Sequence, residues 1–126
     1  MTTIKKILCA VDLTKASHHA FDRALSIARV SKARLYVLHA VPGNVPFSSH
    51  QSERLELLTS LRQRAERAGV RVRAVEQHGD PARVIVLHAN ARPQRADIME
   101  PSRHLRRRMR DDVGAALAVL SGWRPL

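Results

Sequence analysis

The stretch Ile4–Ser17, IKKILCAVDLTKAS, decides the fold of this chain. Its apolar half predicts a buried strand that ends at Asp12, and the residues that follow predict a helix. A second apolar stretch, Arg34–Gly43 (RLYVLHAVPG), predicts another strand that stops at a proline and a glycine. Two such strands joined by one helix form a βαβ unit of a parallel sheet. Open sheets of this kind bind ligands at the carboxyl ends of their strands.

Length and composition predict one domain, residues 1–126, without a membrane span. Hydrophobic residues make up 44% and aromatic residues 3%, so the core must consist of Ala, Val, Leu and Ile. No apolar run approaches the roughly 20 residues that cross a bilayer, and the start MTTIKK lacks the apolar segment of a signal peptide. The single cysteine, Cys9, is predicted to be a buried small hydrophobic residue. We therefore expect a cytoplasmic protein.

The chain is strongly basic, with a formal net charge of +11. Such a surface attracts polyanions. However, few aromatic side chains are present to stack on bases, and no nucleic-acid-binding motif occurs. We expect a solvated basic surface and no nucleic-acid partner, while binding of another polyanion stays open.

Two amphipathic helices are expected in the first half of the chain. The first spans Lys15–Val30, with an alanine every fourth residue on its apolar side and Thr14 as N-cap. The second spans Gln51–Ala68, with Gly69 just after its end, where a left-handed residue commonly terminates a helix. Its apolar side is predicted to consist of Leu55, Leu58, Leu61, Ala65 and Ala68, with the charged residues opposite.

The alternation of Val70–Val75, VRVRAV, predicts a strand at the sheet edge. Asp80 is predicted to cap a third helix that begins at Pro81. A fourth strand should begin near Asp97, but only two apolar residues precede Glu100-Pro101. The third helix is expected to be apolar along Val84, Ile85, Leu87, His88 and Ala91.

The pattern is clear over residues 3–99, whereas residues 100–126 form a divergent, arginine-rich tail. Most of this tail is predicted to be helical, and no final buried strand is evident. If a fifth strand exists, the sequence places it in Ala115–Leu120. The spacing of one helix face is seen in Leu105, Met109, Val113, Leu117 and Leu120.

Several of these features together resemble the universal stress protein (UspA-type) family. They are ILCAVDLTKAS, FDRALSIARV (Phe21–Val30), RLYVLHAVP, AGVRV (Ala68–Val72), HGDPARVI (His78–Ile85) and ADI (Ala96–Ile98). The resemblance implies an α/β fold, with an open parallel sheet and helices on both faces, and commonly a dimer paired through the final strand. Many members bind ATP. By this resemblance, Asp12 would meet the adenine and ribose, and Ala40 would pack on the adenine.

The chain departs from the family where a glycine-rich loop after the fourth strand would hold the phosphates. Between Gly79 and Gly114 it has no glycine, and it reads MEPSRHLRRRMRDD over Met99–Asp112. Backbone N–H groups that turn toward an anion need glycine, and arginines supply charge without that geometry. Asp12 therefore has two interpretations, a nucleotide contact or a carboxylate that bonds the loop before the helix. ATP is then only a candidate cofactor.

The altered tail also affects assembly, because we expect a family-type homodimer to be weakened when the final strand is missing. The tail itself has two interpretations, a frame change in the gene or true divergence.

No catalytic or metal site is predicted. The histidines lack metal-ligand spacing with cysteines or carboxylates, and the sequence contains no nucleophile motif. We therefore expect a protein that is not an enzyme. The expected function is a regulatory or binding module of the stress response without a complete ATP phosphate loop. The alternatives are an ATP-binding stress protein with a divergent phosphate grip and a basic protein that binds polyanions or nucleic acid.

Overall fold

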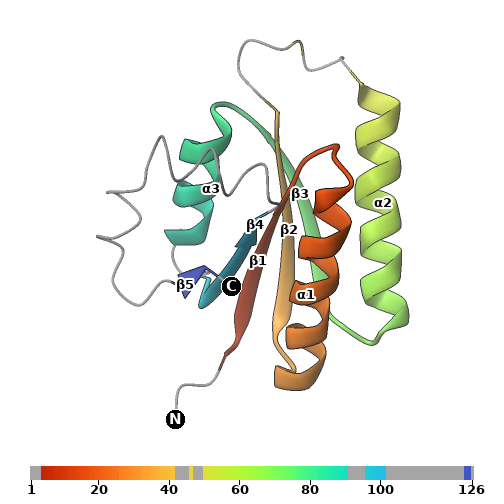
Figure 1. Ribbon diagram of the computed structural model, residues 1–126, viewed down its shortest axis with the longest axis vertical. Helices are drawn as coiled ribbons and strands as arrows, with labels where there is room; N and C mark the ends of the chain where they lie inside the picture. The colour runs from red at the N-terminus through yellow and green to blue at the C-terminus, as the bar shows by residue number, and fades with distance from the viewer. Residues whose placement is uncertain (1–3, 42–45, 47–49, 91–95, 102–123, 126) are drawn as a thin grey trace.

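A computed structural model of the chain describes residues 4–41, 46, 50–90, 96–101 and 124–125. Strands and helices alternate along the chain, as in a βαβ fold (Figure 1). The elements are β1 (Lys6–Val11), α1 (Ala16–Ser31), β2 (Arg34–Val41), α2 (Gln51–Arg67), β3 (Val72–His78), α3 (Pro81–Asn90), β4 (Ile98–Pro101) and β5 (Arg124–Pro125).

The five strands form one parallel sheet in the order β3-β2-β1-β4-β5. The central strand β1 pairs with β2 along its whole length, from Lys6 opposite Arg34 to Val11 opposite His39. On its other side, β1 pairs with β4, which ends with Pro101 opposite Ala10. This confirms the expected open α/β sheet, and it places β3 at an edge, as the alternating sequence predicted.

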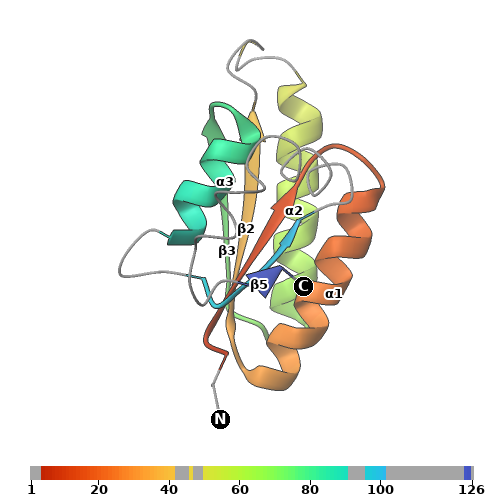
Figure 2. The same ribbon diagram turned by 60° about the vertical axis from the view of Figure 1, so that its left-hand side comes forward.

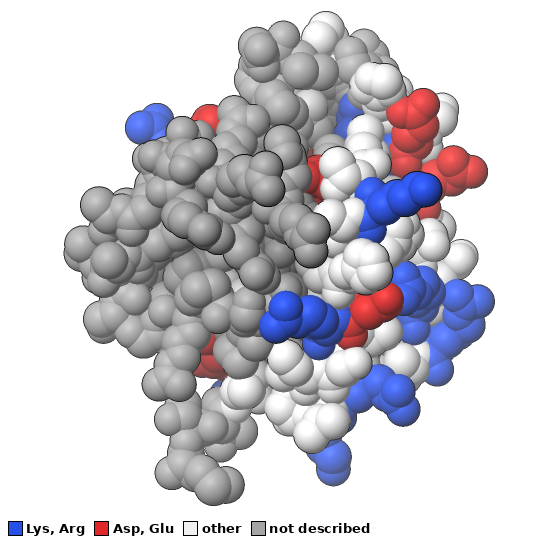
Figure 3. Space-filling model, viewed as in Figure 1, with Lys and Arg blue, Asp and Glu red and all other residues white. Residues whose placement is uncertain are grey.

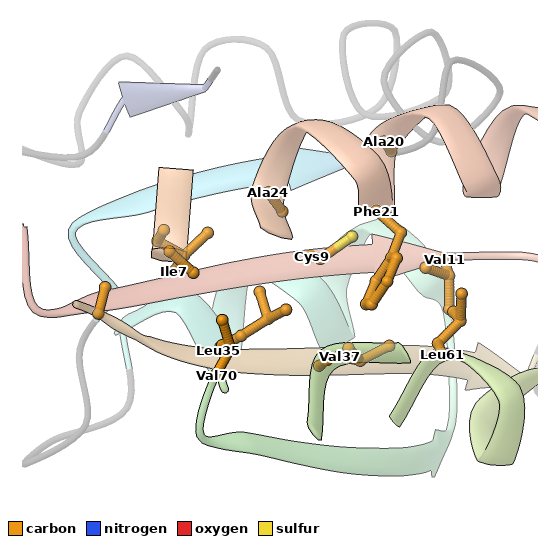
Figure 4. Packing of buried hydrophobic residues seen from close by; sticks show 13 residues of the cluster. Ile7, Cys9, Val11, Ala20, Phe21, Ala24, Leu35, Val37, Leu61 and Val70 are labelled. Carbon is orange, nitrogen blue, oxygen red and sulfur yellow. The ribbon is translucent and has the colours of Figure 1, made fainter. Parts of the chain in front are cut away.

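Helices α1 and α2 cover one face of the sheet, and α3 lies on the other (Figures 1 and 2). The core under α1 and α2 is built from small and branched side chains around a single aromatic ring, that of Phe21 (Figure 4). Phe21 and Leu61 are completely buried there, against Val11 and Val37 of the sheet. Cys9 is also completely buried in this core, which confirms its prediction as a packing residue.

A second, smaller core lies between the sheet and α3. Leu38 and Ala40 of β2 contribute to it, together with Val84 and Ile85 of α3 and Met99 of β4. Because side chains alternate along a strand, Ala40 faces this core whereas His39 points to the side of α1 and α2. At the end of β2, one face of the strand therefore meets the apolar core under α3, and the other carries the polar side chain of His39.

The helix ends follow the predicted signals in two places. Gly69 has φ +76° just after α2, a conformation that glycine adopts without strain. The carboxylate of Asp80 accepts a hydrogen bond from the backbone N–H of Arg83 at 3.2 Å, so Asp80 caps α3 as expected.

Three predicted side-chain positions are wrong. Leu55 is 55% exposed, whereas its neighbour Arg54 is buried, because the carboxylate of Glu76 on β3 gives the guanidinium a partner inside the fold. Leu87 of α3 is 62% exposed although we predicted it in the apolar face. Thr14 is not the N-cap of α1, because Lys15 occupies that position and makes no side-chain capping bond.

The end of the sheet also differs from the sequence prediction. Strand β4 continues through Glu100 and Pro101, which were expected to interrupt it, because both pair with β1. The expectation of a missing final strand is corrected by a two-residue strand, β5, that pairs with Ile98 and Met99. The predicted helix over 105–120 and the alternative strand over 115–120 lie outside the described residues.

Candidate functional site

The carboxyl edge of the sheet contains the point where the chain reverses its strand order. From β1 the chain proceeds through α1 to β2 on one side, whereas β4 on the other side of β1 is reached through α3. A crevice outside the ends of two such strands is where open α/β sheets bind ligands. Asp12 follows β1 directly, and Ala40 is the last residue but one of β2. The structure therefore brings both predicted site residues to this edge.

Asp12 organises the turn between β1 and α1. Its Oδ1 accepts a hydrogen bond from the backbone N–H of Thr14 at 2.9 Å and another from the Thr14 hydroxyl. The Ser17 hydroxyl lies 2.9 Å from the same Oδ1 and 2.8 Å from the Asp12 carbonyl oxygen. The Asp12 N–H in turn donates to Ser17 Oγ at 2.7 Å. The Asp12 carboxylate therefore bonds the loop before the helix, and these bonds hold it at the strand end.

A second polar cluster lies at the same edge, where α2 meets the ends of β2 and β3. Glu76 of β3 accepts a hydrogen bond from Arg54 Nε at 2.8 Å, and its Oε2 lies 3.2 Å from His39 Nδ1. The side chains of Arg54, His39 and Glu76 are 3%, 7% and 16% exposed. This ion-pair cluster joins α2 to the ends of β2 and β3.

Burial lowers the pKa of His39 from its usual value of 6.5, because desolvation penalises the charged ring. The hydrogen bond and negative charge of Glu76 oppose this lowering of the pKa, while the Arg54 guanidinium adds to it and Asp12 weakly opposes it. Desolvation dominates, so His39 is a neutral acceptor or donor in the folded protein near neutral pH.

Two hollows among the described residues do not by themselves form a nucleotide pocket at this edge. A cavity of about 50 Å³ under α3 is lined by Leu8, Tyr36 and His88 among others and touches neither Asp12 nor Ala40. It holds water molecules at most. An open groove of about 510 Å³ between α1 and α2 touches Thr14 but is lined by Glu53 and Glu56, which repel phosphate.

Other classes of site find no support in the described part of the chain. No group of three or more His, Cys, Asp or Glu side chains there is arranged to hold a metal ion. No helix among these residues is long and apolar enough to cross a membrane.

The sequence missed Arg54 and Glu76 as residues of this edge. The available signal was the spacing of Arg54, Leu58, Leu61 and Ala65, which fits one helix face once the arginine is counted with it. The region after β4, where a phosphate loop would lie, falls outside the described residues.

Comparison with solved structures finds proteins of the same fold. A crystal structure of a universal stress protein in complex with cAMP has a TM-score of 0.74 at 23% identity, covering 99% of this chain and 96% of that one. The universal stress protein of Archaeoglobus fulgidus in complex with dAMP has a TM-score of 0.74 at 18% identity, covering 98% of each chain.

A third structure, from the universal stress protein family of Burkholderia pseudomallei, has a TM-score of 0.73 at 20% identity and covers 100% of this chain and 98% of that one. No curated protein matches the sequence significantly. A sequence model of the Universal stress protein family matches residues 3–97, which include β1 to α3 and both predicted site residues. The chain therefore belongs to the universal stress protein family.

Proposed function

We propose that this protein is a non-catalytic regulatory module of the stress response that binds an adenine mononucleotide at the carboxyl edge of its sheet. The observation that carries the proposal is the position of Asp12 at the end of the central strand, beside the reversal of strand order. A carboxylate there is a charged acceptor for ribose hydroxyls. Ala40 on the neighbouring strand is 8% exposed and adds a small apolar residue to this edge, which leaves room for a flat base.

A single phosphate suits the chain better than three. The sequence between Gly79 and Gly114 lacks glycine, so a backbone nest for a triphosphate cannot form there in the usual way. Two structural relatives carry cAMP and dAMP, each an adenine nucleotide with one phosphate. Base and ribose contacts then supply most of the binding energy.

A binding role without catalysis is supported by the state of the polar groups at this edge. Ser17 is completely buried and its hydroxyl bonds Asp12, so it is not available as a nucleophile. The Nδ1 atom of His39 faces Glu76 rather than the crevice. The single-domain organisation over 1–126, the cytoplasmic location and a weakened homodimer remain predictions that accompany this proposal.

Calorimetric titration of the purified protein with AMP, cAMP and Mg-ATP tests the proposal. We expect AMP or cAMP to bind, and Asp12→Asn to weaken this binding about tenfold or more because a neutral amide replaces the charged acceptor. Asparagine keeps an Oδ1 for the Thr14 N–H, so the turn should persist. Asp22→Asn, on the exposed side of α1, is the matched control and should bind like the original chain.

Two results would contradict the proposal. One is the absence of measurable heat with every nucleotide at millimolar concentration. The other is equal affinity of the original chain and Asp12→Asn for AMP. Binding of Mg-ATP much tighter than AMP, with the same loss in Asp12→Asn, would instead establish the alternative of an ATP-binding protein with an arginine-based phosphate grip.

A further inference from the structure

A second hollow lies at the opposite end of the sheet, where the strands begin. It encloses about 520 Å³ between the end of α1 and the joint from α2 to β3. Three of its lining side chains are cationic, those of Arg29, Lys32 and Arg71. We call this hollow the amino-edge groove, and its remaining lining residues are Ala28, Ala33, Ala68, Gly69 and Val70.

Backbone hydrogen bonds fix the positions of these cations. The Leu35 N–H donates to the Arg71 carbonyl at 2.9 Å, which holds Arg71 at the start of β3 beside β2. The Ala33 N–H donates to the Ala28 carbonyl at 3.0 Å, which closes the turn after α1. Lys32 in this turn is left-handed, with φ +56°. The groove is therefore walled by rigid ends of elements rather than by long loops.

Positive charge gathers around this groove without matching negative charge. No carboxylate lines it, and no ion pair involves the side chain of Arg29, Lys32 or Arg71 within the residues that the structure describes. Figure 3 shows blue side chains gathered over the lower ends of α1 and α2. Further cations at the same edge of the sheet are Lys5, Lys6, Arg34 and Arg67.

Two carboxylates at this end of the molecule, those of Glu66 and Asp97, have other partners. Glu66 of α2 lies 3.9 Å from Arg62, on the exposed surface of the same helix. The Oδ2 of Asp97 accepts hydrogen bonds from the backbone N–H groups of Lys5 and Lys6 at 2.8 and 3.0 Å. Both interactions leave the three cations of the groove uncompensated.

Helix dipoles explain part of this cluster but not all of it. The carboxyl ends of α1 and α2 point to this edge, and a helix end of this kind favours cations in its last turn. That effect accounts for Arg29 and Arg67. The helix-dipole effect does not extend to Arg34 and Arg71, because these residues stand at the starts of strands. Repulsion between their charges is unfavourable unless an anion binds.

We propose that the amino-edge groove binds a compact oligophosphate, an anion with three or more linked phosphates. Its volume is that of a small-molecule site. Three exposed cations with thirteen donor N–H bonds between them can meet several phosphate oxygens at once, and Arg offers a paired donor geometry for each phosphate. No aromatic residue lines the groove, so it offers no stacking surface to nucleic-acid bases. This site lies at the end of the sheet opposite to Asp12 and does not depend on nucleotide binding there.

Titration with sodium tripolyphosphate at fixed ionic strength tests the proposal. The test variant is Arg29→Gln, Lys32→Gln and Arg71→Gln together. The control variant removes the same charge from three exposed positions outside the groove, Lys15→Gln, Arg73→Gln and Arg83→Gln. We expect the test variant to bind at least about tenfold more weakly, since each exposed cation contributes modestly, and the control variant to bind like the original chain.

Outcomes that overturn the proposal are equal weakening in both variants, which would show a diffuse charge effect, and no binding of tripolyphosphate at low salt. Duplex DNA of arbitrary sequence that binds more tightly than tripolyphosphate, with the same loss in the test variant, would assign the groove to nucleic acid instead. Asp12→Asn should leave tripolyphosphate binding unchanged, so failure at one edge of the sheet remains distinguishable from failure at the other.

Thermal unfolding without ligand shows whether the three cations of the groove bind an anion or stabilise the fold. If repulsion among the groove cations is relieved by an anion, the test variant should melt at the same or a higher temperature than the original chain, and tripolyphosphate should raise the melting temperature of the original chain only. A test variant that melts several degrees lower would show that the cations serve the fold, and the proposal would fail.

Discussion

Polar side chains at the carboxyl edge of the sheet bond one another, whereas the cations at the amino edge do not. At the carboxyl edge, Asp12 is held by Thr14 and Ser17, and Glu76 is shared by Arg54 and His39. At the amino edge, the cations of the groove lack carboxylate partners within the described residues. Pre-organised polar groups favour a defined ligand geometry, while uncompensated charge favours a ligand that brings the opposite charge.

This comparison predicts that substitutions at the two edges have opposite effects on stability. Removing one member of a buried bonded cluster leaves its partner unsatisfied and destabilises the fold. Removing one of several like charges from an exposed edge does not. The following predictions begin with the largest expected effect.

Arg54→Met should destabilise the protein most, by about 3 kcal/mol in the free energy of unfolding. The guanidinium is buried, and its loss leaves the Glu76 carboxylate without its cationic partner in a site that is 16% exposed. Urea unfolding followed by circular dichroism measures this. Arg62→Met on the same helix removes an exposed ion pair and should change stability by less than about 0.5 kcal/mol.

A second substitution sharpens this test. Adding Glu76→Gln to Arg54→Met should recover part of the lost stability, because a neutral amide is less costly to leave without a cation. If the double variant is less stable than Arg54→Met alone, the cluster acts through packing rather than charge.

Ser17→Ala should destabilise the fold by about 1–2 kcal/mol, because the Asp12 N–H loses its acceptor and Oδ1 loses a donor. Ser26→Ala, on the exposed side of the same helix, serves as the control and should be close to neutral. Equal melting temperatures for the two variants would show that the Asp12 turn does not depend on the buried hydroxyl.

The smallest effect should be a pH dependence carried by His39. Its pKa in the folded protein is lower than the usual 6.5, so between these two pKa values the unfolded chain binds more protons than the folded one. Stability from this group is complete above about pH 7.5 and is lost as the pH falls through 6.5 toward the folded pKa.

The pH dependence of stability is tested by comparing the melting temperatures of the original chain and of two histidine variants across pH 5 to 8. The original chain should lose more stability on acidification than His39→Gln does, whereas His19→Gln at an exposed position should follow the original chain. A steeper loss in His39→Gln than in the original chain would mean that the folded protein binds the proton more tightly, contrary to the direction given by burial.

Much of the fold was predictable because it follows from local patterns. The two apolar runs in IKKILCAV and RLYVLHAV, the alanine stripe of α1, the glycine after α2 and the Asp80 cap each act over a few residues, and the structure confirms them. The position of Asp12 at the sheet edge follows from the βαβ order alone.

The remaining features depend on distant parts of the chain. Arg54 is buried because Glu76, 22 residues away, offers a carboxylate, and no helical spacing reveals that partner. Likewise, β4 continues through Pro101 because β1 lies alongside it, although Glu100 and Pro101 are poor strand residues by themselves. The amino-edge groove is formed by two chain turns that lie far apart in the sequence, so its charges form one cluster only in the folded chain.

The thiol of Cys9 is completely buried, so the rate at which a reagent labels it reports how often the folded protein opens. Cys9 lies on the central strand with its thiol in the core under α1 and α2, so a thiol reagent reaches the sulfur only when this core opens. At high reagent concentration, the rate of labelling becomes the rate of opening. Ligands at the two edges of the sheet can then be compared without an engineered label, by how far each one slows this single reaction.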